Sequence, residues 1–135
     1  MAQSLPTVGS DNNTWGSMLN GYLEVAHNAD GTAYAITLIT SANSPYVVAN
    51  ENPVKINEVI LANAVSGAIT VTLPDATNTT FNTNIYAVKK VDTSSNIVTI
   101  NTTSSQTIDG GLTALLLVPF VSVNLVSNGS NWLVI

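Results

Sequence analysis

The residues with the best spacing for chemistry are Glu24, His27 and Asp30, which follow one another at intervals of three. On a helix this spacing gathers an imidazole between two carboxylates, which suits a metal ion or acid–base catalysis. A second nitrogen ligand is missing, because His27 is the single histidine and the chain has no cysteine. We therefore favour a solvated helix end, where the imidazole interacts well with the helix dipole. We expect no catalytic residue, no metal and no cofactor.

Asp75, Asp92 and Asp109 are a second candidate, a carboxylate cluster for glycoside cleavage. Each follows or opens a turn, where an aspartate caps its own backbone, and we favour that role. The stretches Asn28-x-Asp30-Gly31 and Asp109-Gly110-Gly111 resemble pieces of calcium loops but lack further oxygen ligands and a closing glutamate. A Gly-x-Ser-x-Gly nucleophile elbow and a phosphate-binding glycine loop are also missing. The sequence predicts a protein without enzymatic activity.

Aromatic and basic side chains give two further candidates. Four aromatic residues could form a stacking platform for a sugar ring: Tyr46, Tyr86, Phe120 and Trp132. Trp132 lies in an apolar run, however, which favours a place in the core. Lys89 and Lys90 are adjacent, and neighbouring residues of a strand point to opposite faces. We therefore expect at most one of these lysines to meet a buried partner.

Composition limits the partners. Only 8% of the residues are charged, about a third of the usual share, so the surface costs little to desolvate. Such a surface favours tight contacts between subunits and suits hydrogen bonding to sugars. A net charge of -5 with three cationic side chains argues against nucleic acid, which needs clustered positive charge. Without an apolar run of about 18 residues or a signal-like start, we expect no membrane insertion and a soluble chain made in a cytoplasm.

The elements that would position these residues change type along the chain. Residues 1–13 show no period and predict an extended arm. From Thr14 the apolar residues follow one helical face: Trp15, Met18, Leu19, Tyr22, Leu23 and Ala26. A short amphipathic helix of this length is marginal alone in water, so it must pack on something. We prefer packing between three copies; packing on the chain's own strand domain is the alternative.

From Ala33 onward the pattern changes to short strands. They are predicted at 34–40, 46–49, 59–65, 68–73, 85–91, 97–100, 114–118, 121–126 and 132–135. Ser66-Gly67 predicts a two-residue hairpin loop, and the apolar strand at the carboxy terminus is expected to lie centrally. Regular strand spacing with turn signals predicts an all-β fold, an antiparallel β-sandwich or jelly-roll-like domain of about eight to ten strands.

Two sets of motifs resemble a known group of proteins. The opening contains Pro6-Thr-Val-Gly9, Trp15-Gly16, Leu19-Asn20 and Asp30-Gly31-Thr32, and it resembles the amino-terminal segment of phage fibre and virion-surface proteins. Later motifs resemble a recurrent phage fibre-tip or decoration module: Leu73-Pro74-Asp75-Ala76, Tyr86-x-x-Lys89-Lys90-Val91-Asp92, Val98-Thr-Ile100, Gln106-Thr-Ile-Asp109-Gly110 and Val126-Ser-Asn-Gly129-Ser-Asn-Trp132. The resemblance implies a trimer on a virion, with one end bound to the particle and the other facing outward.

Motifs and resemblance together predict a docking arm with a short helix at 1–32 and a β-sandwich domain at 33–135. We expect a non-enzymatic, homotrimeric capsid decoration protein or short fibre, made in the host cytoplasm and placed on the virion surface. The arm would dock on capsid, tail or baseplate proteins through Leu5, Pro6 and Val8. The helix would form the oligomer interface through Trp15, Met18, Leu19, Tyr22 and Leu23. The alternative is a tail-fibre or baseplate receptor-binding module that recognises host-surface carbohydrate.

Overall fold

The computed structural model describes residues 36–49, 57–79, 81–82 and 84–135. The chain divides into two units, Met1–Tyr34 and Ala35–Ile135, and the described residues belong to the second. These residues form nine strands and one short 3-10 helix, with no α-helix among them. The all-β class and the predicted strand positions are confirmed for this part of the chain, with boundaries that differ by at most two residues. The predicted arm and helix lie outside the described residues.

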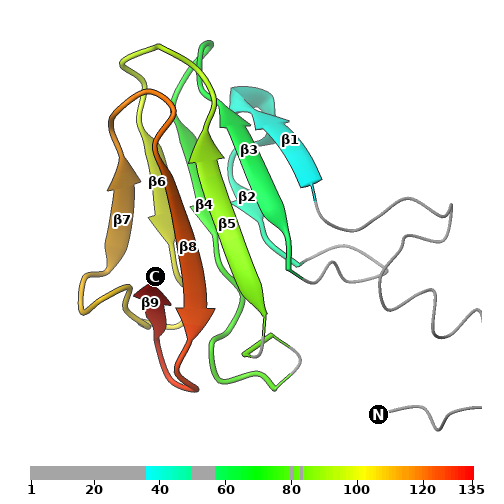
Figure 1. Ribbon diagram of the computed structural model, residues 1–135, viewed down its shortest axis with the longest axis vertical. Helices are drawn as coiled ribbons and strands as arrows, with labels where there is room; N and C mark the ends of the chain where they lie inside the picture. The colour runs from blue at the N-terminus through cyan, green and yellow to red at the C-terminus, as the bar shows by residue number, and fades with distance from the viewer. Residues whose placement is uncertain (1–35, 50–56, 80, 83) are drawn as a thin grey trace, which may run out of the picture. The chain divides into compact units, whose positions relative to one another are not determined.

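The strands belong to two open sheets (Figure 1). The five-stranded sheet has the order β1 (Ile36–Thr40), β3 (Val59–Asn63), β5 (Ile85–Lys90), β8 (Ser122–Ser127) and β9 (Trp132–Val134). The four-stranded sheet has the order β2 (Tyr46–Val47), β4 (Ile69–Thr72), β6 (Val98–Asn101) and β7 (Thr113–Leu116). The 3-10 helix η1 (Ser41–Asn43) lies between β1 and β2.

The first six strands alternate between the two sheets. The chain passes from β1 to β2, from β3 to β4 and from β5 to β6, so each circuit adds one strand to each sheet. Within each sheet, strands that are two positions apart in the chain pair in parallel: β1 with β3, β3 with β5, β2 with β4 and β4 with β6. Ile36 faces Val59, for example, and Val59 faces Ala87. The predicted antiparallel pairing is therefore wrong for the contacts among these six strands, because consecutive strands lie in different sheets and cannot pair with each other.

The last three strands reverse direction and pair antiparallel. β7 returns along β6, β8 lies against β5, and β9 lies against β8. Here the predicted antiparallel pairing is confirmed. The prediction that the carboxy-terminal strand lies centrally is wrong, because β9 is an edge strand of the five-stranded sheet. Its apolar character is explained by Trp132, which points inward and is fully buried.

The predicted hairpin at Ser66-Gly67 is also wrong. β3 and β4, which flank it, belong to different sheets, so the turn is a corner between sheets. The Gly67 amide donates to the Ala64 carbonyl over 3.1 Å, which closes the corner. A Cβ atom at Gly67 would lie 3.3 Å from the Cβ atom of Ser41, so the missing side chain allows η1 to approach closely.

Inward side chains of both sheets form one apolar core. Its largest fully buried apolar members are Ile39, Ile60, Ile69, Leu73, Tyr86, Ile100, Leu116, Leu125 and Trp132. The Tyr86 and Trp132 rings meet edge to face, with centroids 5.6 Å apart. The Trp132 indole N–H donates to the Pro74 carbonyl over 3.2 Å, which satisfies the one polar group of that side chain. The predicted core position of Trp132 is confirmed.

Alternation along the strands places residues on the inner or the outer side. Ile69 and Val71 are buried in β4. Ile36 and Leu38 share one side of β1, and this side points outward, with 68% and 63% of each residue exposed. Ile39 occupies the inner side of β1. The structure therefore carries apolar residues on both sides of the five-stranded sheet.

Candidate interaction surfaces

The residues predicted to dock and to trimerise lie outside the described part of the chain. They are Leu5, Pro6, Val8, Trp15, Met18, Leu19, Tyr22 and Leu23. Glu24, His27 and Asp30 lie outside it as well. Their predicted roles stay predictions.

The three candidate aspartates hold different parts of the backbone. Asp75 Oδ1 accepts hydrogen bonds from the Thr77 amide at 2.9 Å, the Thr77 hydroxyl at 2.8 Å and the Gln106 side-chain amide at 2.6 Å. These three bonds, in that order of importance, hold the pKa of Asp75 below its ordinary value. Asp109 instead accepts from the Val134 amide, over 3.2 Å. The described residues contain no group of three or more histidine, cysteine, aspartate and glutamate side chains able to hold a metal ion.

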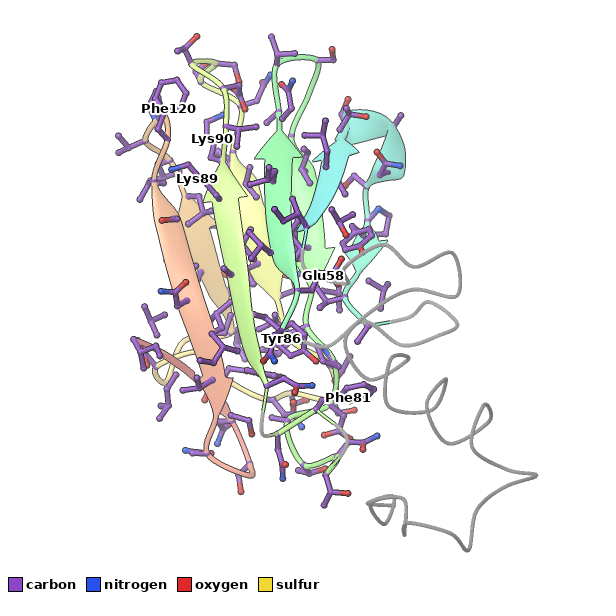
Figure 2. All side chains as sticks on the ribbon, turned by 45° about the vertical axis from the view of Figure 1, so that its right-hand side comes forward. Glu58, Phe81, Tyr86, Lys89, Lys90 and Phe120 are labelled. Atoms are coloured by element: carbon purple, nitrogen blue, oxygen red, sulfur yellow. The ribbon has the colours of Figure 1, made fainter. Side chains whose placement is uncertain are left out.

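Asp92 forms a buried ion pair with Lys90, which is the last residue of β5 (Figure 2). The Lys90 ammonium donates to Asp92 Oδ1 at 2.7 Å, to the Asn96 carbonyl at 2.9 Å and to the Ser94 hydroxyl at 3.2 Å. Asp92 Oδ2 accepts from the Ala64 amide at 2.7 Å. All three ammonium protons and both carboxylate oxygens are thus used, and the pair joins the loop after β5 to the corner after β3. The predicted turn role is confirmed for Asp75 and Asp92, whereas Asp109 bonds a distant strand.

The ionisation of Asp92 reflects two opposing effects. Burial disfavours the charged carboxylate and acts to raise its pKa. Hydrogen bonds from Lys90 and Ser94, and from the Ala64 and Ser94 amides, outweigh burial and hold the pKa of Asp92 far below its ordinary value. Lys89 points to the other side of β5, and its ammonium donates to the Phe120 carbonyl over 2.7 Å. The prediction that at most one of the two lysines meets a buried partner is confirmed.

Glu58 is a buried acid that sequence reasoning did not find. Its carboxylate accepts from the Tyr46 hydroxyl at 2.5 Å and from the Thr37 hydroxyl, so it links β1 and β2 across the two sheets. Burial raises the pKa of Tyr86, the Asn84 hydrogen bond lowers it, and the charge of Glu58 raises it further. The one sequence signal for a buried Glu58 is its position directly before the apolar run of β3. Its partners cannot be identified from the local sequence, because they come from other strands.

The four aromatic residues do not assemble into a stacking platform. Trp132 and Tyr86 are fully buried in the core. Tyr46 is half-buried with its hydroxyl on Glu58, and Phe120 lies at the far end of the domain, beside Lys89 (Figure 2). Phe120 is the most exposed of the four, at 55%.

The outer side of the five-stranded sheet is an apolar face. We use "apolar face" for its apolar outward residues Ile36, Leu38, Val59, Leu61, Ile85, Ala87, Val126 and Leu133, with Ile135 just beyond β9. The same side also carries the polar residues Thr40, Asn63, Ser122 and Asn124. The pairing register makes these residues neighbours. Leu38 is paired with Leu61 on the neighbouring strand, and Leu61 with Lys89 on the next. Ile85 is paired with Val126, and Val126 with Leu133. Lys89 is the one charged side chain that the described strands place on this side.

The outer side of the four-stranded sheet has the opposite chemistry. We use "threonine face" for its outward residues Thr70, Thr72, Thr99, Asn101 and Thr113, with Val47 and Leu115 at the edges. Thr72 is paired with Asn101 on the neighbouring strand, and Asn101 with Thr113 on the next. Thr70 is paired with Thr99. Hydroxyl and amide groups therefore repeat about every 4.8 Å across the strands and about every 7 Å along them.

The two faces correspond to two sequence patterns. In β4, Ile-Thr-Val-Thr, and β6, Val-Thr-Ile-Asn, apolar and polar residues alternate strictly, as in strands with one face in water. In β3, Val-Ile-Leu-Ala-Asn, and the start of β5, Ile-Tyr-Ala-Val, apolar residues occupy both sides. Such continuous runs are typical of strands that are covered on both faces. They are the signal from which the apolar face could have been found.

Comparison with protein families and with curated proteins adds no relative. No protein-family model matches the chain, and no curated protein matches it at a significant level. Within the described part of the chain, no helix has the length and apolar character needed to cross a membrane. Function is therefore inferred from the two faces together with the sequence resemblance.

Proposed function

We propose that this protein is a non-enzymatic structural protein of a virion surface. It is a homotrimeric capsid decoration protein or short fibre, built on a β-sandwich domain and anchored to the particle by its amino-terminal arm. The observation that carries the proposal is the apolar face, an extended and nearly uncharged surface on a domain whose buried polar groups serve its own loops. Flat surfaces of this kind suit contacts between proteins.

The internal use of the polar groups supports a structural role. Lys90 and Asp92 hold two corners together, Glu58 links β1 to β2, and Gln106 joins two loops through Asp75 and the Ala76 amide. Side chains that would otherwise be candidates for acid–base work are thus engaged in hydrogen bonds that stabilise the fold. The outward chemistry of the described domain consists mainly of its two flat faces.

The virion assignment rests on the sequence resemblance, and the structure brings several residues of the later motifs into contact. Trp132 donates to the Pro74 carbonyl, and the Ser127 hydroxyl donates to the Ala76 carbonyl over 2.7 Å. The Gln106 side chain bonds Asp75 in the same region. Residues of the motifs at 73–76, 106–110 and 126–132 are therefore hydrogen-bonded to one another at one end of the domain. These contacts support a shared structural role for the motifs.

Removal of the arm tests the attachment. We expect deletion of residues 1–13 to abolish binding to purified particles of the virus that encodes the protein, because the docking residues Leu5, Pro6 and Val8 are removed. Binding is measured by co-sedimentation with particles that lack the protein. The control is the native mass of the truncated chain, which should remain that of a trimer. Co-sedimentation equal to wild type would overturn the proposed anchor.

The threonine face favours a second candidate, recognition of host-surface carbohydrate. Its regular hydroxyl and amide groups can donate to and accept from sugar hydroxyls without the cost of stripping water from ions. Under this candidate, the wild-type chain binds immobilised host glycans, and the double variant Thr72→Val and Thr99→Val loses binding. The pair Leu38→Thr and Leu61→Thr, on the apolar face, is the matched control and should keep it. Absence of binding by the wild-type chain would exclude this candidate.

A further inference from the structure

We infer that the apolar face is the surface through which one copy of this chain binds a second copy. The inference rests on the proposed function, since it locates a contact of the proposed oligomer on the strand domain instead of on the predicted helix alone. Its residues come from β1, β3, β5, β8 and β9, so the face runs from one edge of the five-stranded sheet to the other.

The exposed area matches what a protein partner needs. Ile36, Leu38 and Ile135 are each exposed by about two thirds, at 68%, 63% and 66%, and Ile85 by 47%. Together with the half-buried members, the face offers on the order of 600 Å² of apolar surface, the upper end of what a monomer usually exposes in one patch. A standard interface takes roughly 800 Å² from each partner, and the polar residues of the same side, Ser122 and Asn124 among them, would supply the remainder.

The charge distribution fits a like partner. Two copies of one surface repel each other when the surface is charged, because each charge meets its own sign. The chain carries a net charge of -5, yet the described strands place no carboxylate side chain on the apolar face. Its one cation, Lys89, is bonded to the Phe120 carbonyl at the end of the domain. Contact between two such faces therefore carries almost no electrostatic penalty.

The width of the face favours a second copy over the chain's own predicted helix. An α-helix is about 10–12 Å across, whereas strands lie about 4.8 Å apart. One helix lying along the strands therefore covers about two of the five strands. The apolar residues extend over a wider area, from Ile36 in β1 to Leu133 in β9. Around the three-fold axis of the proposed trimer, the face of each copy meets the same face of both neighbours, and these two extended surfaces cover more of it than one helix does.

Protection of a single introduced thiol tests the inference in the full-length chain. The natural sequence has no cysteine, so Leu38→Cys gives one thiol on the apolar face and Thr113→Cys gives a matched thiol on the exposed threonine face. We expect maleimide to label Leu38→Cys about tenfold more slowly than Thr113→Cys at high protein concentration, because association covers the face by mass action. Dilution should bring the two labelling rates together.

Each other outcome overturns the inference. Equal labelling of both thiols at every concentration would mean that the face is open. Protection of Leu38→Cys that persists at a dilution where the native mass is that of a monomer would mean that a segment of the same chain covers the face, for example the predicted helix packed on its own strand domain.

Native mass separates this inference from the proposed function. We expect Leu38→Asp to lower the native mass of the full-length chain, and Thr113→Asp to leave it unchanged. Strand circular dichroism checks that both variants fold. If Leu38→Asp keeps the mass of a wild-type trimer, the apolar face is not the interface, while the proposed trimer stands. If wild type is itself a monomer at all concentrations, both fail.

Discussion

The two outer faces of the domain differ in chemistry although the same circuits of chain build them. The apolar face carries isoleucine, leucine and valine at most outward positions, and the threonine face carries hydroxyl and amide groups at the equivalent places. Both sheets contribute to the same core, so the difference arises only at positions that do not affect the interior. Interior packing therefore specifies the fold, and outward residues are free to specify partners.

Removal of the largest core side chain should destabilise the whole domain, and with it both outer faces. We expect Trp132→Ala to lower the free energy of unfolding by about 3–5 kcal/mol, because it leaves a cavity beside Tyr86 and removes the bond to Pro74. The next residue, Leu133, belongs to the apolar face, and Leu133→Ala should cost less than about 1 kcal/mol in the protomer. Urea unfolding at one fixed protein concentration measures both. Equal losses would contradict the division between interior and face.

Breaking the buried ion pair should give the next largest effect. Asp92→Asn leaves the Lys90 charge without its buried partner, and we expect a loss of about 3 kcal/mol at neutral pH. The folded-state pKa of Asp92 lies below the unfolded value of about 3.9, so its contribution is complete above that pH and is lost as the pH falls below it. Wild-type stability should therefore decline from about pH 4 downward.

The same measurement has an internal control. Asp92→Asn should show a flatter decline in unfolding free energy below pH 4 than wild type, because the titrating group is gone. The pKa of Asp75 is also lowered, but this carboxylate lies on the surface side of its loop, so Asp75→Asn should change the decline less. A wild-type stability that stays constant through this range would rule out the ion pair as a stabilising element.

Exchanging the chemistry of the faces should have the smallest effect on folding. Thr72→Val with Thr99→Val, or Leu38→Thr with Leu61→Thr, should each change protomer stability by about 0.5 kcal/mol or less per site, since none of these side chains faces the core. Solubility should respond in opposite directions. The valine pair should precipitate at lower ammonium sulfate concentration than wild type, and the threonine pair at higher. A shift in the same direction would mean that the faces are equivalent.

Much of the fold follows from local pattern, and the rest depends on distant partners. Alternation located the strands, and Asx chemistry gave the turn roles of Asp75 and Asp92. Alternation tells which residues share a side of a strand, but not which sheet the strand joins or which neighbour it pairs with. The Ser66-Gly67 turn was therefore mistaken for a hairpin, and β9 for a central strand.

The candidate surfaces show the same limit. Ile36 and Leu38 are two residues apart and therefore share a side of their strand, but their apolar character is equally typical of a core and of an interface. Glu58 could not be assigned, because its partners Thr37 and Tyr46 come from strands in different sheets. The resemblance covers the opening segment, several loops and parts of β5 and β6, and it includes only single outward residues such as Lys89, Thr99 and Val126, so it did not outline the two faces.

The circuit of chain that places one strand on each sheet also makes the domain extensible. β1 with β2, β3 with β4 and β5 with β6 are successive copies of one structural step, and β7, β8 and β9 close the series by turning back. Duplication of one step within the series would widen both sheets by one strand, about 4.8 Å, without a new kind of contact. Size could therefore vary by whole increments during evolution, with both outer chemistries growing in step.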